Sequence, residues 1–301
     1  MDIKINIREE DSKGLSFEFS KNGECVITGI GRCKESCVTI PKKVKNMFSE
    51  YLVTEIKKDA FADCKSIVSV DIPDSIRRIG KGAFDGCSEL VSVAMPDSVE
   101  DIGMLAFGSC SRLERIEIPN VKSIGKSAFY GCVGLKRVKI PDSVQKIEEN
   151  AFRLCGLTCI EMPRTLSSID DYAFCDCTAI EKTELPESLV RIGNGAFCGC
   201  SGLRSIKLPE SVMFVGEEAF RGCSGLLSVE ISGDIVSLEE HVFKDCTALK
   251  EIKIKGDAPV IFDRAMVGVC ATVYYDPSKK GWEEAVGKDY GGTLTWVALS
   301  N

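Results

Sequence analysis

The sequence predicts a repeat solenoid, in which one short unit is stacked on itself many times around a shared core. Two observations carry this prediction: the run Ala-Phe-x-x-Cys recurs nine times, with Val242 in place of the last Ala, and successive copies lie 22 or 23 residues apart. A unit of this size buries its apolar side only against its neighbours, so a fixed period indicates stacking. The recurring pairs are Phe61/Cys64, Phe84/Cys87, Phe107/Cys110, Phe129/Cys132, Phe152/Cys155, Phe174/Cys177, Phe197/Cys200, Phe220/Cys223 and Phe243/Cys246.

Each unit divides into two extended segments and one turn. In the second unit, residues 90–95 alternate as a half-buried strand, and Pro96, which has no N–H, suits the point where a strand ends. Val99 and Ile102 face inward from the second segment, and Phe107 lies in a helical or 3₁₀ turn. The sequence therefore predicts a right-handed stack of short β-strands with 3₁₀ or helical turns, capped at both ends, with a period in the leucine-rich-repeat range.

A column of short polar residues recurs beyond each strand. A side chain that carries a hydrogen-bonding oxygen can satisfy backbone groups of the tight turn, one turn after another. We therefore expect a polar ladder along the stack. Its members are Ser75, Ser98, Asn120, Ser143, Thr165, Ser188, Ser211, Asp234 and Asp257.

The repeated unit resembles the BspA-like leucine-rich-repeat family of bacterial and protist surface proteins. Residues 72–87, I-P-D-S-I-R-R-I-G-K-G-A-F-D-G-C, are typical of that family, and the similarity extends over roughly residues 38–270. Residues 15–30 resemble its N-terminal hairpin, and residues 271–275 and 292–296 resemble its C-terminal strands. The resemblance implies an exported, adhesin-like protein, because several kinds of member bind host matrix proteins. It transfers no catalytic residue.

The expected organisation is one continuous domain in three parts. Residues 1–37 form an N-terminal β-hairpin cap, residues 38–255 form a solenoid of about ten repeats, and residues 256–301 form a C-terminal cap. The first repeat is irregular and carries an insertion at residues 46–51. A solenoid needs such caps because its end units would otherwise expose core.

Composition narrows the function classes. The 301 residues carry a formal net charge of −7 with no basic block, which disfavours a nucleic-acid partner. No apolar run reaches the roughly 18 residues of a membrane span. The only histidine, His241, has no nucleophile or orienting group in a motif around it, so we expect no enzyme activity, no cofactor and no metal.

The compartment stays open at this stage. The first residues lack the basic and apolar regions of a signal peptide, which favours the cytoplasm, whereas the family resemblance implies the cell surface or the extracellular space. The oligomeric state is not encoded in any motif, and we favour a monomer.

Sixteen cysteines raise the question of disulfides or zinc. The nine repeat cysteines are expected to be reduced thiols in the core. Cys175 and Cys198 follow the repeat Phe on adjacent units, so a strained disulfide between them is one alternative. A four-sulfur zinc site with Cys177 and Cys200 is another, weakened because Cys175 and Cys198 are expected to point outward.

One candidate binding surface is basic. Outward positions of the strands alternate in charge in several places, as in Glu117, Lys139 and Glu161, which favours a self-neutralising, solvated face. The alternative is a positive spot that attracts an acidic protein partner. Its residues are Arg115, Arg137, Lys139 and Lys182.

The second candidate surface is apolar. Positions that carry charged or polar residues in early units become apolar in three later ones, at Val190, Met213 and Val236, with Phe214 beside them. Contiguous exposed apolar residues often mark a contact surface. The alternatives are scattered surface apolarity or burial under the C-terminal cap. The expected function is non-enzymatic protein binding of adhesin type; the alternative is a structural spacer or an intracellular scaffold.

Overall fold

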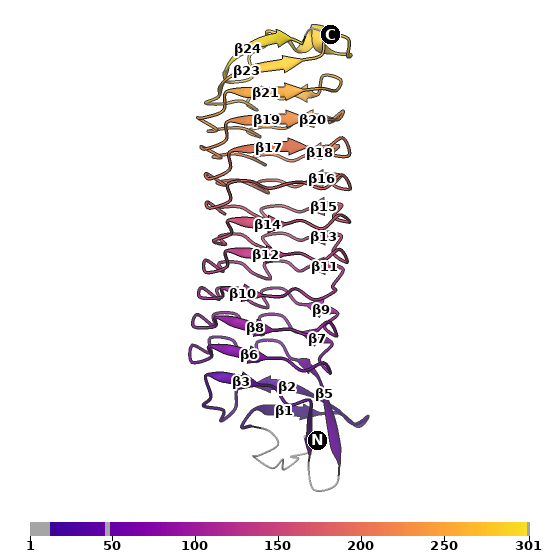
Figure 1. The fold of residues 1–301 in the computed structure, drawn as a ribbon, viewed down its shortest axis with the longest axis vertical. Coiled ribbons are helices and arrows are strands. Elements are labelled where there is room, and N and C mark those ends of the chain that lie inside the picture. The colour runs from indigo at the N-terminus through magenta and orange to yellow at the C-terminus, as the bar shows by residue number, and fades with distance from the viewer. Residues whose placement is uncertain (1–12, 46–48, 300–301) are drawn as a thin grey trace.

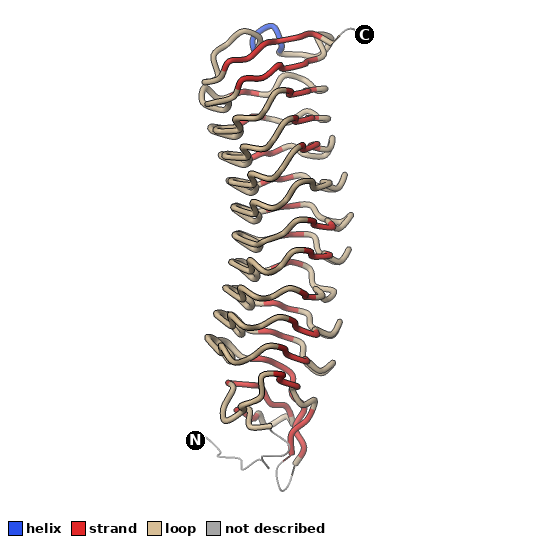
Figure 2. The backbone as a smooth tube through the Cα atoms, turned by 60° about the vertical axis from the view of Figure 1, so that its left-hand side comes forward, coloured by secondary structure: helices blue, strands red, loops and turns tan. Residues whose placement is uncertain are grey.

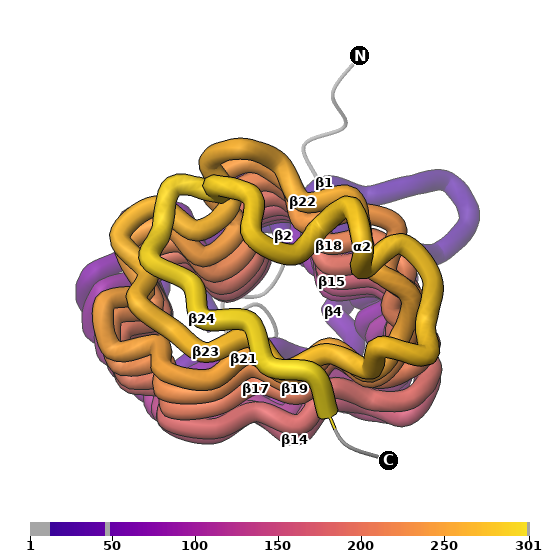
Figure 3. Tube along the Cα trace, turned by 90° about the horizontal axis from the view of Figure 1, so that it is seen from above, coloured from indigo at the N-terminus to yellow at the C-terminus, as the bar shows by residue number. Residues whose placement is uncertain are grey.

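The computed structural model describes residues 13–45 and 49–299, which form a β-solenoid of about eleven turns. The turns are stacked into a nearly straight column, with β1 near one end of it and β24 at the other (Figure 1). Figure 2 shows that each turn consists of short strands joined by longer loops. Figure 3, along the column, shows the turns superposed around a common interior. The predicted repeat solenoid is confirmed.

One side of the column, here the long-strand face, carries the first extended segment of each unit. Its strands run parallel, and each pairs in register with the strand one turn away except at two breaks. The strands are β3 (Cys37–Thr39), β6 (Ser69–Asp71), β8 (Ser92–Ala94), β10 (Arg115–Ile116), β12 (Arg137–Lys139), β14 (Cys159–Glu161), β17 (Ser205–Leu208), β19 (Ser228–Ile231), β21 (Glu251–Ile254), β23 (Cys270–Tyr275) and β24 (Thr293–Ala298).

The other side, here the short-strand face, carries the second extended segment. Its two-residue strands continue from β5 (Glu50–Ile56); in all but β22 the first residue is exposed or half-buried and the second is buried. The remaining strands are β7 (Arg78–Ile79), β9 (Asp101–Ile102), β11 (Ser123–Ile124), β13 (Lys146–Ile147), β15 (Ser168–Ile169), β16 (Arg191–Ile192), β18 (Phe214–Val215), β20 (Ser237–Leu238) and β22 (Val260–Ile261).

The repeat phenylalanines form a continuous stack through the core. All nine are fully buried, and neighbouring ring centroids lie 5.0 to 5.7 Å apart with interplanar angles of 1° to 14°. The backbone fixes this geometry, because each Phe N–H donates to the carbonyl before the next Phe at 2.8 to 3.0 Å. Each Phe ring therefore stacks on the next because the repeat places equivalent backbone positions one above the other.

The repeat cysteines are a second column, beside the rings. From Cys87 to Cys246, each Sγ donates a hydrogen bond to the carbonyl oxygen of the Phe one turn earlier, at 3.0 to 3.2 Å. Burial raises the pKa of Cys87 to about 12. These side chains are free thiols, as expected for the column, and each gives a Phe carbonyl oxygen a second donor, beside the N–H of the Cys three residues after that Phe.

The expected helical or 3₁₀ turn around each Phe is wrong. Leu105 and Ser109, two residues before and two after Phe107, have φ of 57° and 54°. The same two left-handed positions recur in every unit, and a right-handed helix needs negative φ throughout. The segment is therefore a series of separate turns, and the one α-helix of the described residues is α2 (Trp282–Ala285), near the C-terminal end.

The polar ladder largely forms as expected. The hydroxyls of Ser98, Ser188 and Ser211 each donate to a carbonyl oxygen one turn earlier, at 2.7 to 2.8 Å, and Thr165 does the same to Val144 at 2.9 Å. Ser143 has no partner for its buried hydroxyl, and the turn before it is the shortened one that carries Asn120. A missing residue therefore removes one step of the ladder.

Both ends of the column carry additional strands and aromatic side chains. At the N-terminal end β1 (Ser16–Phe19) and β2 (Glu24–Gly29) pair antiparallel, and β4 (Lys43–Lys45) pairs antiparallel with β5. Part of the expected insertion, residues 46–48, lies outside the described residues. At the other end Trp282 and Trp296 pack 6.1 Å apart over the last turns. The three-part division of the chain at residues 37 and 255 stays a prediction.

The stacking continues after the sequence period fades. β23 pairs in register with β21, and β24 with β23. Met266 and Val269 are buried 23 residues after Phe243 and Cys246, and they take the places of the Phe and the Cys. Parallel turns thus extend into the segment that was expected to act only as a cap.

One inward column on the long-strand face contains a polar side chain. Val138, Ile160 and Ile206 occupy this column in neighbouring units, whereas Thr183 occupies it in the unit between β14 and β17. Thr183 is 6% exposed, and its hydroxyl has no hydrogen-bond partner. A buried hydroxyl without a partner is destabilising, so this unit is a weak point of the core.

We expect Phe152→Ala to lower the free energy of unfolding by about 3–5 kcal/mol, because it removes a ring from the middle of the stack and leaves a cavity. Urea unfolding followed by circular dichroism measures the loss. Phe262→Ala, at a ring that is 40% exposed, is the control and should change stability much less. Equal losses for the two variants would contradict the stacked core.

We expect Thr183→Val to raise the free energy of unfolding by about 1 kcal/mol, because it removes the unpartnered hydroxyl at nearly constant volume. The same substitution at Thr165, whose hydroxyl binds two carbonyl oxygens, should lower it by about 1 kcal/mol. The same urea titration measures both variants, and a stability loss at Thr183 would show that its hydroxyl is satisfied in solution.

Candidate protein-binding surfaces

The long-strand face is interrupted at two places. β10 pairs with β8 but not with β12, and β14 pairs with β12, whereas the following unit has only the single bridge from Lys182 to Ser205. β10 and β14 belong to the two units that contain 22 residues instead of 23, between Phe107 and Phe129 and between Phe152 and Phe174. At each break, the strand of a short unit pairs with the strand of the turn before it but not with that of the turn after it.

A hollow of about 680 Å³ opens at the first break. Arg115 of β10 and Arg137 of β12, two residues of the predicted positive spot, line it together with Ile116. Arg112 and Lys136 add two cations, against two carboxylates; the full lining is Ser111, Arg112, Glu114, Arg115, Ile116, Glu117, Gly134, Lys136 and Arg137. The hollow is therefore basic.

Much of this positive charge is not neutralised locally. Arg112 forms an ion pair with Glu89 at 2.6 Å, but no ion pair within the described residues includes Arg115, Arg137 or Lys139. The expected ion pairs between adjacent turns, such as Lys139 with Glu161, do not form, although these two residues are in register. An ion pair between two long exposed side chains stabilises a protein only slightly, so alignment of the backbones is not enough to bring these charges together.

Lys182 lies apart from the other predicted basic residues. Its ammonium pairs with Glu184 on the same turn at 2.7 Å, and this contact raises the pKa of Lys182. It lines two hollows, of about 510 and 390 Å³, on either side of the unit that contains Thr183. The structure therefore brings Arg115 and Arg137 together and leaves Lys139 and Lys182 outside their hollow.

Thr183 and the two breaks were missed at the sequence level. A polar residue in an otherwise Val and Ile column was a usable signal for Thr183, and the two 22-residue intervals were a usable signal for the breaks. The intervals alone do not determine whether the strand of a short unit loses its pairing with the turn before it or with the turn after it.

The predicted apolar residues are exposed and contiguous on the short-strand face. Val190 is 38% exposed, Met213 47%, Phe214 46% and Val236 50%, so the C-terminal turns do not cover them. Backbone hydrogen bonds from Met213 to Val190, at 3.0 Å, and from Val236 to Met213, at 3.1 Å, place them on consecutive turns. They form a continuous apolar surface rather than scattered residues.

The surface extends further than the sequence pattern indicated. Val260 lies one turn after Ser237 and in register with it, and it is 62% exposed. Phe262, two residues later, is 40% exposed. Both lie where the sequence period fades, which is why they were not recognised. We call the six residues the apolar ridge: Val190, Met213, Phe214, Val236, Val260 and Phe262.

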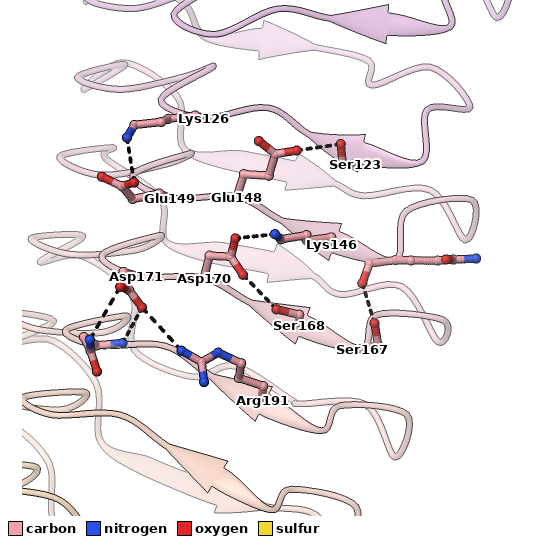
Figure 4. A network of polar contacts seen from close by, with 12 residues as sticks. Ser123, Lys126, Lys146, Glu148, Glu149, Ser167, Ser168, Asp170, Asp171 and Arg191 are labelled. Atoms are coloured by element: carbon pink, nitrogen blue, oxygen red, sulfur yellow. Dashed lines mark hydrogen bonds and ion pairs between the residues drawn. The ribbon is translucent and has the colours of Figure 1, made fainter.

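Earlier turns use the same positions for a polar network (Figure 4). Lys146 on β13 pairs with Asp170 at 2.8 Å, and Asp170 also accepts a hydrogen bond from Ser168 at 2.8 Å. Arg191, which lies within 3.9 Å of Asp171, is in register with Phe214 of the next turn. The short-strand face therefore changes from polar cross-links to apolar side chains at this point.

Neither the alternative zinc site nor a formed disulfide is present among the described residues. No group of three or more potential metal ligands occurs within the described residues, and all sixteen cysteines are free thiols. Cys177 and Cys200 donate to core carbonyl oxygens, which separates them from any site with Cys198. Cys175 is buried but does not belong to the core cluster, and its Sγ donates to the Asp176 carboxylate at 3.3 Å.

Comparison with known proteins agrees with this architecture. A family model described as a BspA type leucine rich repeat region, in six copies, matches residues 54–181 and 167–273. None of the helices within the described residues is long and apolar enough to cross a membrane. No curated protein matches the chain.

Two solved structures show the same fold. A leucine-rich repeat protein from Bacteroides ovatus is 24% identical with a TM-score of 0.54, and the alignment covers 100% of both chains. A leucine rich cell surface protein from Faecalibacterium prausnitzii is 27% identical with a TM-score of 0.52, over 96% of this chain and 93% of that chain. With the family model covering most of its stacked turns, this chain belongs to the BspA-type leucine-rich-repeat family.

Proposed function

We propose that this chain is a non-enzymatic protein-binding module, an adhesin-like surface protein that recognises a protein partner, such as one of a host matrix. The apolar ridge is the observation that carries the proposal. Four consecutive turns expose apolar side chains where the preceding turns carry polar ones. Contiguous apolar surface of this kind on a folded protein usually marks a contact site.

The ridge by itself is smaller than a complete protein–protein interface. Four strands at about 4.8 Å spacing span about 15 Å. A stable interface buries about 800 Å² on each partner, with an apolar centre and a polar rim. The ridge alone provides such a centre but not the full area, so a partner must also contact the polar side chains around it, including Arg191 and Ser237.

The basic hollow is the second candidate surface. Arg115 and Arg137 line it without carboxylate partners among the described residues, so an acidic segment of a partner protein would gain ion pairs there. The hollow lies on the long-strand face and the ridge on the short-strand face, so we treat them as separate sites.

Family membership and one neighbour support a location at the cell surface. The similar protein from Faecalibacterium prausnitzii is named a cell surface protein. The competing proposal is a spacer or intracellular scaffold, which the straight column would suit because it holds its two ends far apart (Figure 2).

We expect Met213→Glu with Phe214→Ser to weaken binding to matrix proteins at least tenfold, because it places a charge in the apolar centre of the interface. Surface plasmon resonance with a panel of purified extracellular matrix proteins measures the effect. Val133→Glu with Leu227→Ser is the matched control, since these residues are equally exposed, at 51% and 48%, but lie outside the ridge.

Two outcomes would contradict this proposal. If the wild-type chain binds no member of the panel, the adhesin role fails and the spacer proposal is favoured. If the ridge variant and its control bind equally, the ridge is not the site. Sedimentation of both variants shows whether either change alters the oligomeric state.

We expect Arg115→Glu with Arg137→Glu to abolish binding to any partner whose affinity falls steeply with added salt, because the variant reverses the charge of the hollow. The same resonance assay, repeated at 50 and 500 mM salt, measures this. Lys244→Glu with Lys288→Glu makes the same change in net charge away from the hollow and should leave the binding nearly unchanged.

A further inference from the structure

Cys175 and Cys198 are brought together by the stacking. Each directly follows a repeat Phe, and the rings of Phe174 and Phe197 stack at 5.3 Å. The N–H of Asp176 donates to the carbonyl oxygen of Cys198 at 2.7 Å, so the two turns are joined at this point. The two thiols are close enough to shift each other's pKa. Equivalent residues of adjacent turns stacked at about 4.8 Å lie within the Cα range of about 4.4–6.8 Å that a disulfide spans.

Accessibility distinguishes this pair from the cysteines of the core. Cys132 and Cys155 are also neighbouring thiols, as are Cys223 and Cys246, but all four are buried in the repeat column. Cys64 is half-buried beside the buried Cys87, but the Cys87 thiol donates to the Phe61 carbonyl oxygen in the core. Cys198 is half-buried, so a small reagent in solvent reaches its sulfur, and Cys175 lies buried directly beside it. In this pair, one thiol is accessible and the other is positioned to react with it.

The surroundings divide the two thiols by role. The neighbouring Cys175 thiol lowers the pKa of Cys198, and Arg221 contributes in the same direction, although burial and the carboxylates of Glu218 and Asp176 oppose them. The neighbouring Cys198 thiol and burial raise the pKa of Cys175, and the Asp176 carboxylate, to which Cys175 Sγ donates at 3.3 Å, raises it further. Cys198 therefore forms the thiolate first, and a thiolate is the nucleophile in disulfide exchange.

We propose that Cys175 and Cys198 are a redox modification site, at which a small disulfide oxidant such as oxidised glutathione installs a bridge between adjacent turns. The Cys198 thiolate attacks one sulfur of the oxidant, forms a mixed disulfide and releases one glutathione thiolate. Cys175 then gives its proton to solvent, attacks the Cys198 sulfur and releases the second glutathione. Two protein thiols are oxidised, and one glutathione disulfide is reduced to two thiols.

The bridge would connect the two turns where the polar network gives way to the apolar ridge. Asp170 and Asp171 of the network precede Cys175 in its turn, and Val190, the first ridge residue, precedes Cys198 in the next. Oxidation would therefore fix the turn that begins the ridge to the turn before it. This modification does not depend on the partner, so its test is independent of the proposed binding function.

The test begins from a full-length background in which the exposed thiols of Cys37, Cys159 and Cys270 are replaced by serine, which leaves thirteen of sixteen cysteines. The folded protein is incubated with oxidised glutathione, unfolded without reductant, and its thiols are counted. We expect eleven thiols and, in a digest analysed by mass spectrometry, one linked pair of peptides containing Cys175 and Cys198. Circular dichroism confirms that the protein stays folded.

Two variants of this background check the order of the steps. Cys175→Ser should accumulate one glutathione on Cys198, and Cys198→Ser should take up none at Cys175, because that sulfur is shielded. Thirteen thiols in the parent after oxidation would overturn the proposal. A persistent glutathione adduct on Cys198 in the parent, or a bridge between any other two cysteines, would overturn it as well.

Discussion

The structure depends on one constraint, which is that the core residues of each turn lie directly over their counterparts in the neighbouring turn. Parallel strands in register set the vertical spacing, and cross-turn hydrogen bonds from each repeat Phe N–H hold the turn region at the same spacing. The phenylalanine rings stack nearly parallel because their backbones are spaced in this way. The cysteine column follows the same rule, since each thiol meets the same carbonyl oxygen one turn earlier.

Because of this constraint, whether a side chain finds a hydrogen-bond partner depends on the residues at the same position in the neighbouring turns. A hydroxyl in the right column, such as Ser188 or Ser211, finds a carbonyl partner because the turn before it is identical. A wrong residue has no such partner, and Thr183 shows the cost, because its hydroxyl lies among aliphatic side chains. On the surface of the column, apolar residues at equivalent positions of three or four consecutive turns form a continuous surface, because these positions adjoin one another.

The features that repeat along the sequence could be predicted, whereas those without a repeated residue type could not. The period sufficed for the solenoid, the Phe and Cys columns and the exposure of Met213 and Phe214. It did not reveal that left-handed residues such as Leu105 prevent a helical turn, because many side chains other than glycine occupy those positions. It also missed the last turns, since Met266 and Val269 preserve buried volume without preserving residue identity.

Departures from the period are where specific recognition can arise on this scaffold. A perfect repeat pairs every strand with the next and presents the same surface at each turn, so no turn differs from another as a binding site. One residue fewer in two units leaves strands unpaired and opens the hollow lined by Arg115 and Arg137. The change from Arg191 to Phe214 at one position begins the apolar ridge. Both candidate surfaces thus arise from small local changes that the regular core tolerates, because its Phe stack passes through them without interruption.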